Sequence, residues 1–181
     1  MQKTYPTLIT DRLVLNQPVL SDVEDIENVL KDEIYYRNTI NIPKPYTKES
    51  AIYWVNLARE LFESGNGLIL AIRTSANGKI IGGIGLGIDS KFNKAELGYW
   101  LHQDFWNKGF ATEAVKAVIK FGFEELKLKR IFSTHFDFNI ASGKVMENAG
   151  MKKEGVMECF TKKDGQYQNH VLYAIINQNI T

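Results

Sequence analysis

The stretch that decides the fold of this chain is Trp100-Leu101-His102-Gln103-Asp104-Phe105-Trp106-Asn107-Lys108-Gly109-Phe110-Ala111-Thr112-Glu113-Ala114. Around its start, apolar residues alternate with others at the period of two that a strand produces: Ala95, Leu97, Tyr99 and Leu101. Beyond Gly109 the apolar residues recur at helical spacing. The pattern predicts a strand over 95–102, a short loop containing glycine, and an amphipathic helix that begins near Gly109.

A helix entered in this way suits a negatively charged ligand. The first backbone N–H groups of a helix have no partner inside the helix, and the helix dipole places partial positive charge at the same end. Small residues at Gly109 and Ala111 would let a phosphate approach the main chain closely. We therefore predict that residues 107–112 form a phosphate cradle; a plain tight turn is the alternative.

The remaining pattern predicts one mixed α/β domain over residues 1–181. Seven strands are expected, at 8–15, 67–73, 79–89, 95–102, 130–137, 151–161 and 167–176. Four helices are expected: one after the capping-box pattern Ser21-Asp22-Val23-Glu24, one from Thr47, one from about Gly109 and one from Asn139. Because some strands follow one another directly, only part of the connections cross over through helices.

The strand predicted over 79–89 is rich in glycine, at Gly82, Gly83, Gly85 and Gly87. A dinucleotide-binding motif is excluded, because the spacing differs and a strand follows instead of a helix. Alternation places Gly83, Gly85 and Gly87 on one face of the strand. Such a face permits the close approach of a ligand or a helix, and we expect a tightly packed helix there.

The composition is that of an ordinary globular protein, since 44% of the residues are hydrophobic and 24% are charged. The net charge is +1, which argues against a nucleic-acid surface. The start of the chain has no apolar signal core, and no apolar run approaches the roughly 20 residues of a membrane span. The one cysteine, Cys159, fits a reducing compartment, and it and the three histidines lack the spacing of a zinc site. We expect a cytoplasmic protein without nucleic-acid, membrane or metal partners.

Three polar residues elsewhere are candidates for chemistry. Asn139 and Ser142 open a helix and, being three residues apart, lie on the same side of it. Asn139 is also a good helix cap, so a structural role is the alternative. Glu96 lies on the face of its strand opposite Leu97, where partial burial would raise its pKa and suit it to act as a general base. A solvated strand glutamate is the alternative reading of Glu96.

A set of motifs follows in order along the chain: Glu96-Leu97-Gly98-Tyr99-Trp100-Leu101, Phe105-Trp106-Asn107-Lys108-Gly109-Phe110-Ala111-Thr112-Glu113-Ala114, Asn139-Ile140-Ala141-Ser142, and Ala149-Gly150-Met151 with Glu154-Gly155. Together they resemble the GCN5-related N-acetyltransferases, and among these the RimJ/RimL type, which acetylates ribosomal-protein N-termini. The opening Thr10-Asp11-Arg12-Leu13 and the Asp164-Gly165 turn before Leu172-Tyr173 fit the same branch. The resemblance covers nearly the whole chain.

The resemblance implies a three-layer fold with a mixed, mostly antiparallel sheet of about seven strands and about four helices. It implies acetyl-CoA as co-substrate, with the pyrophosphate on the amides of Asn107, Lys108, Gly109, Phe110, Ala111 and Thr112. The pantetheine arm would run along Trp100, Leu101 and His102 like an added strand and would contact Asn139. Ser142 would protonate the leaving CoA thiolate. The family transfers the acetyl group directly to an amine, which agrees with the lack of a nucleophile motif here.

The sequence departs from the family pattern near the cradle and in a later strand. Trp106 stands where the family usually has Arg or Gln, and Asn107 where the RimJ/RimL branch commonly has glycine. In some RimL-type enzymes a glutamate on the strand after Gly155 serves as the general base. This chain has Thr161 at that position. Glu96 is therefore our first candidate for the general base, and Glu158 the second.

The sequence leaves the acceptor open. The branch implies a primary amine at the N-terminus of a ribosomal protein; a small amine such as a polyamine, an aminoglycoside or an amino acid is the alternative. Acceptor preference would depend on the first two helices and the loop 38–46. A non-catalytic module that binds CoA is a further alternative, and both a monomer and a homodimer fit the sequence.

Overall fold

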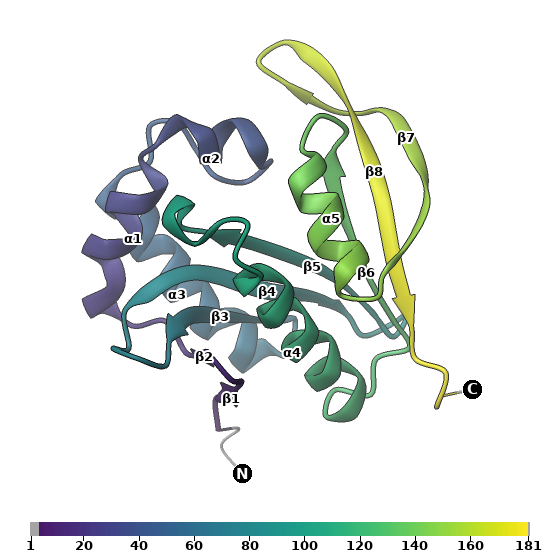
Figure 1. Cartoon of the computed structure of the whole chain (residues 1–181), viewed down its shortest axis with the longest axis horizontal. Helices are drawn as coiled ribbons and strands as arrows, with labels where there is room; N and C mark the ends of the chain where they lie inside the picture. Colours follow the sequence, from purple (N-terminus) through teal and green to yellow (C-terminus); the bar gives the residue numbers. More distant parts are fainter. Residues whose placement is uncertain (1–3, 181) are drawn as a thin grey trace.

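The computed structural model describes residues 4–180 as a mixed eight-stranded sheet with helices on both faces (Figure 1). The strands lie in the order β1-β2-β3-β4-β5-β6-β8-β7. They are β1 (Leu8–Ile9), β2 (Leu13–Asn16), β3 (Gly67–Thr74), β4 (Ile80–Asp89), β5 (Lys94–Leu101), β6 (Arg130–Phe136), β7 (Lys152–Lys163) and β8 (Gln166–Ile176). Neighbours are antiparallel except for β5 and β6, which run parallel. The expected mixed, mostly antiparallel sheet is confirmed.

The described part of the chain has five α-helices, in two layers. They are α1 (Val23–Leu30), α2 (Glu33–Asn38), α3 (Lys48–Ser64), α4 (Phe110–Glu124) and α5 (Ile140–Asn148). Apolar residues of α1 and α3 form one core cluster with Trp100 of β5, whereas those of α4 and α5 form another with Leu97 of the same strand. Because neighbouring strand residues point to opposite faces, the sheet has an α3 face and an α4 face.

The first predicted strand is wrong in one respect, because the structure divides it into β1 and β2. Thr10 makes the turn: its N–H donates to Leu13 O at 2.9 Å, and its Oγ1 accepts from Leu13 N at 3.0 Å. Leu8 consequently pairs with Leu15 in a short antiparallel ladder. Arg12 lies in the connection between the two strands, where it can reach another element.

The predicted capping box at Ser21 is also wrong, because α1 continues directly from a 3-10 turn over Leu20–Asp22. The Asp22 carboxylate accepts from Val19 N at 2.8 Å and pairs with Arg73 at 2.6 Å. The short helix α2 was not expected. Its six residues are too few for a periodic pattern to stand out, although Asp32 caps it by accepting from Ile34 N at 3.0 Å.

The glycine-rich strand β4 packs under a helix, as expected, at Gly83. A Cβ added there would lie 2.7 Å from Trp54 of α3 and 2.5 Å from the indole nitrogen of Trp100. No side chain fits, so glycine allows the two indoles to approach the sheet. Gly87 on the same face has open space in front of it. A Cβ at Gly85 would likewise lie 2.9 Å from Leu68 O. Close packing thus accounts for Gly83 and Gly85 and leaves the face uncovered at Gly87.

Strands β5 and β6 separate after only three residue pairs, and the last pair is Glu96 with Phe132. At the point of separation Ser133 Oγ still donates to Leu97 O at 2.7 Å. From there β5 continues to Leu101 beside β4, while β6 continues beside β8. We call this divergence the splay; α5 lies against it on the α4 face (Figure 1).

Candidate active site

Helix α4 begins without a side-chain cap. Its N-cap is Gly109, at φ 80°, and Asn107 before it is also left-handed, at φ 57°. The first backbone bond of the helix runs from Glu113 N to Gly109 O at 3.0 Å, so the amides of residues 110–112 precede the helical ladder. Gly109 is exposed. This geometry leaves backbone donors free at a helix N-terminus, as a phosphate cradle requires, and the cradle itself stays a prediction.

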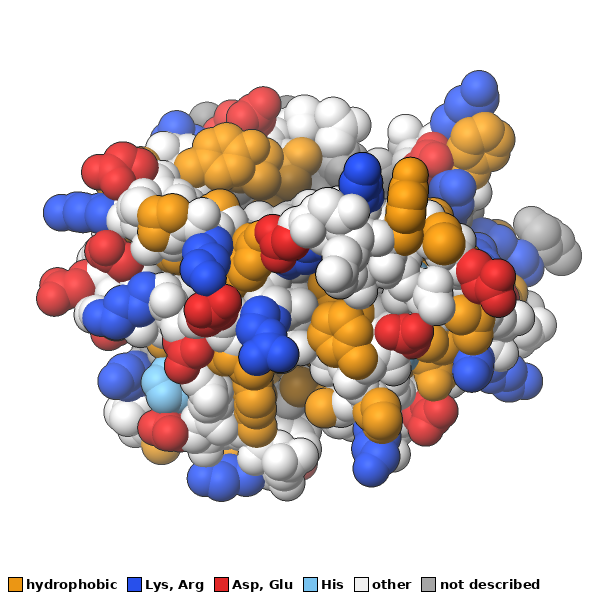
Figure 2. Space-filling model, turned by 90° about the horizontal axis from the view of Figure 1, so that it is seen from above, with side chains coloured by type: hydrophobic (Ala, Val, Ile, Leu, Met, Phe, Trp, Pro, Cys, Tyr) orange, Lys and Arg blue, Asp and Glu red, His pale blue; other side chains and the backbone are white. Residues whose placement is uncertain are grey.

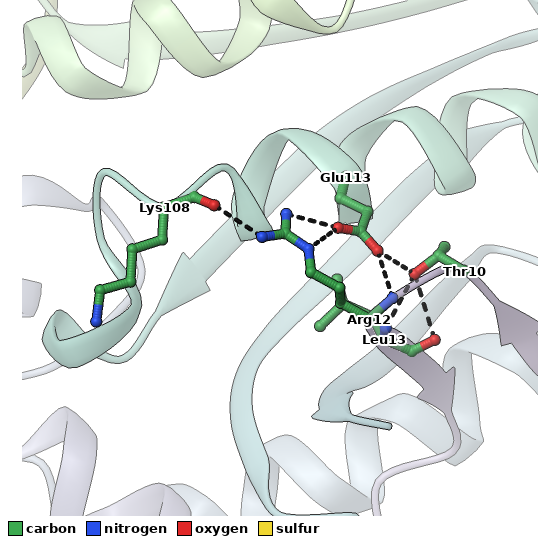
Figure 3. A network of polar contacts seen from close by, with 5 residues as sticks. All are labelled: Thr10, Arg12, Leu13, Lys108 and Glu113. Atoms are coloured by element: carbon green, nitrogen blue, oxygen red, sulfur yellow. Dashed lines mark hydrogen bonds and ion pairs between the residues drawn. The ribbon is translucent and has the colours of Figure 1, made fainter. Parts of the chain in front are cut away.

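Arg12 fixes the cradle from the side (Figure 3). Its guanidinium pairs with the Glu113 carboxylate at 2.7 Å and donates to Lys108 O at 3.0 Å, and it lies 4.1 Å above the Phe110 ring. Thr10 Oγ1 donates to the same carboxylate at 2.6 Å. Two residues of the first hairpin therefore hold both the loop and the first turn of α4.

The Glu113 carboxylate would repel a phosphate if it were not neutralised. Burial by itself raises the pKa of Glu113, but the hydrogen bonds from Thr10 and Arg12 outweigh burial, and the pKa lies below its ordinary value. The carboxylate is thus ionised at neutral pH, and its charge is balanced by Arg12. What remains at the mouth of α4 is the partial positive charge of the helix.

Trp106 ties the loop to the end of β5. Its indole N–H donates to Leu101 O at 2.6 Å, and Tyr35 of α2 donates to the same carbonyl at 3.1 Å. The two rings meet edge to face, with centroids 6.2 Å apart. Trp106, which stands where the family usually has Arg or Gln, therefore anchors the loop to the backbone at the end of β5.

The hydrogen-bond register of β5 decides which of its backbone groups face the splay. His102 N donates to Ile81 O at 2.7 Å, so Trp100 and His102 direct their backbone groups toward β4. Tyr99 and Leu101, one residue out of phase, direct theirs toward the splay. Of the three residues predicted to follow the pantetheine arm, Leu101 thus presents its backbone N–H there, while its carbonyl is held by Trp106 and Tyr35. The Trp100 side chain is buried on the α3 face. Tyr99 is the residue that sequence reasoning missed.

Asn139 caps helix α5. Its Oδ1 accepts from Ser142 N at 3.3 Å, and its Nδ2 donates to Asn38 O of α2 at 3.4 Å. The structural role considered for Asn139 is therefore present in the structure. A contact with pantetheine stays a prediction for this residue.

Ser142 lies in the first turn of α5 and contacts β5 across the splay. Its Oγ is 2.8 Å from Tyr99 Oη, and the phenol also donates to Ser142 O at 3.0 Å. Burial raises the pKa of Tyr99, although the hydrogen bond with Ser142 acts in the opposite direction. Tyr99 therefore stays protonated and remains a donor. Both side chains lie on the α4 face, the same side as the cradle.

Glu96 lies on the α3 face, at the last pair before the splay. It lines a hollow of about 270 Å³ with Gly87, Asp89, Lys94 and Phe132. Desolvation raises the pKa of Glu96 above its ordinary value. The second candidate base, Glu158, is exposed on the irregular part of β7. The structure thus brings Glu96, and not Glu158, to the edge of the splay.

Thr161, where the family base was expected, contacts a buried histidine. Its Oγ1 is 2.9 Å from His170 Nε2, and Thr134 Oγ1 of β6 is 3.1 Å from His170 Nδ1. Burial lowers the pKa of His170, and the neighbouring His135 adds to the effect. The ring is therefore neutral at pH 7 and hydrogen-bonded at both nitrogens.

Seen from above, hydrophobic side chains stand on both sides of a furrow between the half with α1–α3 and the half with α5, β7 and β8 (Figure 2). Acidic and basic side chains are interspersed on this face.

Across residues 4–180, no group of three or more potential metal ligands comes together. The helices described there are too short or too polar to span a bilayer.

Comparisons with known proteins agree with this geometry. Residues 12–152 match the family described as Acetyltransferase (GNAT) domain. The uncharacterized N-acetyltransferase YoaA of Bacillus subtilis (strain 168) is 31% identical over 95% of this chain and 97% of its own length. The [ribosomal protein uS5]-alanine N-acetyltransferase of Escherichia coli (strain K12) is 26% identical over 96% of this chain and 92% of its own.

The fold recurs in a solved RimL, a ribosomal L7/L12 α-N-protein acetyltransferase in complex with coenzyme A. The TM-score is 0.86 at 20% identity, over 94% of this chain and 98% of that one. The family match spans most of the chain and contains both the cradle and the splay. This protein therefore belongs to the GNAT family of acetyltransferases, enzymes that take the acetyl group from acetyl-CoA.

Proposed function

We propose that this protein transfers the acetyl group of acetyl-CoA directly to the N-terminal amine of a protein, and specifically of a ribosomal protein. One observation carries the direct transfer: the splay divides the site between two faces. The uncapped mouth of α4 and Ser142 lie on the α4 face. Glu96 lies on the α3 face, where Gly98 has open space before it. Donor and acceptor can thus meet from opposite sides of the sheet.

The donor fits the α4 face in three places. The amides of residues 110–112 suit the pyrophosphate, because they are free donors at the positive end of a helix. The backbone of Tyr99 and the N–H of Leu101 suit the pantetheine amides, because strand edges bind extended chains by main-chain hydrogen bonds. Ser142 would donate a hydrogen bond to the departing sulfur. Asn139 would contact the same arm.

The acceptor amine would approach on the α3 face and attack the thioester carbon. A nitrogen–carbon bond forms, the carbon–sulfur bond breaks, and the sulfur leaves with the electron pair. The attacking nitrogen loses a proton, which Glu96 takes directly or through one water. A raised pKa makes Glu96 a better proton acceptor than an ordinary glutamate.

A protein N-terminus fits the acceptor side better than a polyamine. Lys163 donates to backbone carbonyls of Tyr36 and Thr39, which places a cation between α2 and the β7–β8 turn. Asp164 beside it is engaged by the Tyr36 hydroxyl. A fixed cation disfavours a polycationic acceptor. The exposed Phe138 and Phe160 offer apolar contact to a peptide. The relationship to the uS5-alanine enzyme supports the ribosomal assignment.

The test is an acceptor panel with purified protein and acetyl-CoA. Peptides beginning with alanine or serine, spermidine, an aminoglycoside and free amino acids are compared by release of the CoA thiol. Because acceptor amines titrate, the panel is run from about pH 6 to about pH 9. We expect turnover on peptides with a free N-terminus and none on the same peptides acetylated beforehand. Turnover confined to the small amines would assign the alternative acceptor class. CoA binding without turnover on any amine would indicate a non-catalytic module.

The role of Glu96 is tested with Glu96→Gln, and Glu158→Gln is its comparison. We expect Glu96→Gln to lower kcat/KM by about 100-fold, because a positioned general base contributes that much or more. A base works only when ionised, so activity of the unmodified protein should fall as the pH falls through the raised pKa of Glu96. A larger loss in Glu158→Gln than in Glu96→Gln would reverse the order of the two candidates.

A further inference from the structure

We propose that Tyr99 is a positioning residue whose hydroxyl aims the Ser142 hydroxyl at the departing sulfur, so that the two side chains act as one hydrogen-bond-donating pair. This inference rests on the proposed function, in which Ser142 serves the leaving group. It assigns to Tyr99 a role in transfer and none in recognition of the acceptor, because the residue lies on the α4 face.

The contact between the two residues joins elements that are distant in the sequence. Tyr99 is in the second half of β5 and Ser142 in the first turn of α5, 43 residues later. The Oη–Oγ distance of 2.8 Å is typical of a good O–H···O bond. Because the backbone of Tyr99 faces the splay, the pair lies beside the path proposed for the pantetheine arm.

Relative acidity decides what Ser142 can do. A thiol has a pKa of about 8.5, whereas an aliphatic hydroxyl is a far weaker acid. A serine that gave up its proton to a thiolate would become an alkoxide, which is unfavourable without a strong proton source behind it. Ser142 therefore keeps its proton and stabilises the developing negative charge on sulfur by hydrogen bonding, as donors in an oxyanion hole do for oxygen. The sulfur takes its proton later, from solvent.

Such a donor must point at the sulfur, and a serine hydroxyl rotates freely unless a partner fixes it. Two arrangements fit the distances. In one, Tyr99 donates to Ser142 O, and the serine proton is directed at Tyr99 Oη. In the other, Tyr99 donates to Ser142 Oγ, and the serine proton is free to point at the ligand. An incoming thioester favours the second arrangement, because only there does the sulfur receive a hydrogen bond.

Burial ensures that the phenol keeps this role. The raised pKa of Tyr99 means that the hydroxyl is protonated at every pH at which an amine acceptor reacts. Donation from Tyr99 also withdraws electron density from Ser142 Oγ, which strengthens the bond that serine makes in turn.

The test is Tyr99→Phe, which removes the hydroxyl and keeps the ring. The matched control is Tyr173→Phe on the other side of α5, where a buried tyrosine of β8 donates to Glu147 Oε1 at 2.8 Å. Each variant loses one hydroxyl that ties a strand to α5, so the two variants should lose similar stability. We expect Tyr99→Phe to lower kcat by about 10-fold with an unchanged Kd for acetyl-CoA, and Tyr173→Phe to change neither.

A double variant separates aiming from packing. If Tyr99 acts through Ser142, the variant Tyr99→Phe/Ser142→Ala should be no slower than Ser142→Ala alone. The inference would be overturned if the two losses in kcat multiply in the double variant, or if Tyr99→Phe keeps a full kcat. Neither outcome would affect the proposed acetyltransferase function. Failure of the unmodified protein to turn over any amine would instead overturn the proposed function, and this inference with it.

A titration of bound CoA tests the pair without turnover. A donated hydrogen bond favours the thiolate, so the thiol of CoA should have a lower pKa when bound to the unmodified protein than when bound to Tyr99→Phe. Ultraviolet absorbance of the thiolate measures this difference directly. An equal thiol pKa in both complexes would contradict the proposal.

Discussion

Helices α4 and α5 begin on the same face of the sheet, but their first turns differ. Helix α5 is capped by Asn139, whose side chain accepts from Ser142 N at 3.3 Å. Helix α4 has the left-handed Gly109 at the same position and no side-chain cap. Asp32 and Thr47 cap α2 and α3, while α1 continues from a 3-10 turn. Among the helices of the described chain that do not continue from a 3-10 turn, only α4, where a ligand is expected, lacks a side-chain cap.

The comparison teaches how a helix N-terminus is kept both open and rigid. A side-chain cap orders the first turn but occupies the donors that a phosphate needs. At α4 the ordering comes from outside the helix, through Arg12, Thr10 and Trp106, and none of these contacts uses the amides of residues 110–112. At α5 the cap is Asn139, directly before the helix, and a side chain, that of Ser142, would contact the ligand.

The largest effect is expected from placing a negative charge at the uncapped N-terminus of α4. Gly109→Asp places a carboxylate where the pyrophosphate would lie, and we expect the Kd for acetyl-CoA to rise on the order of 100-fold. Isothermal titration calorimetry measures it. Gly109→Asn is the control, since asparagine has the same shape and tolerates positive φ. Gly109→Asn should raise the Kd for acetyl-CoA by about 10-fold, because its side chain adds bulk beside Arg12. An added Cβ would lie 3.4 Å from Arg12 Nη2. Equal losses of affinity in the two variants would show that the shape of the side chain, and not its charge, controls binding at the N-terminus of α4.

Removing the external brace should have the next largest effect. In Arg12→Ala the loop loses its contact with Lys108 O, and the Glu113 carboxylate is left without its partner beside the phosphate site. We expect about 10-fold weaker binding of acetyl-CoA, and about 1 kcal/mol lower stability because the guanidinium is 45% exposed. A variant that binds acetyl-CoA as tightly as the unmodified protein would limit Arg12 to a structural role.

We expect the loss of stability in Arg12→Ala to depend on pH. The pKa of Glu113 is lowered in the folded state, so its pairing contributes stability at pH values above the ordinary glutamate pKa. That contribution is lost as the pH falls through the folded pKa. The difference in melting temperature between the unmodified protein and Arg12→Ala should therefore be largest near neutral pH and shrink in acid. A difference that grows in acid would contradict this assignment.

A smaller effect is expected at the capped helix. Asn139→Ala removes the cap and should lower the free energy of unfolding by about 1 kcal/mol, measured by chemical denaturation. Asn139→Ser keeps a capping oxygen and loses the amide, so it should restore most of the stability. If Asn139 also contacts pantetheine, Asn139→Ser will still bind acetyl-CoA several-fold more weakly, by about 1 kcal/mol. Full affinity in Asn139→Ser would confine the residue to capping.

The smallest effect is expected for Trp106→Phe. The variant loses the indole bond to Leu101 O, but Tyr35 still donates to the same carbonyl. We expect the affinity for acetyl-CoA to fall by no more than about 3-fold, because a net hydrogen bond contributes about 1 kcal/mol and a second donor remains. A tenfold loss would mean that Trp106 alone holds the loop.

Local sequence patterns are enough to predict the elements around the site. Period-two and helical spacing placed β5 and α4, and Gly109 marked the boundary between them, because these signals depend only on residues close together in the chain. The glycine pattern of β4 predicts a strand under a helix, which holds at Gly83 and does not hold at Gly87. The same local reasoning joined β1 to β2 and missed α2, where a turn made by one threonine and a helix of six residues leave little periodic pattern.

Which residues contact one another across the site follows from the packing of distant elements. Arg12 meets Glu113 across 101 residues, and Tyr99 meets Ser142 across 43, and no local pattern encodes such pairs. The register between β4 and β5 decided that Tyr99, and not Trp100, directs its backbone to the splay, because a shift of one residue reverses every group on a strand. The face of Glu96 followed from alternation in the sequence. Its position at the last pair before the splay follows from where β5 and β6 separate.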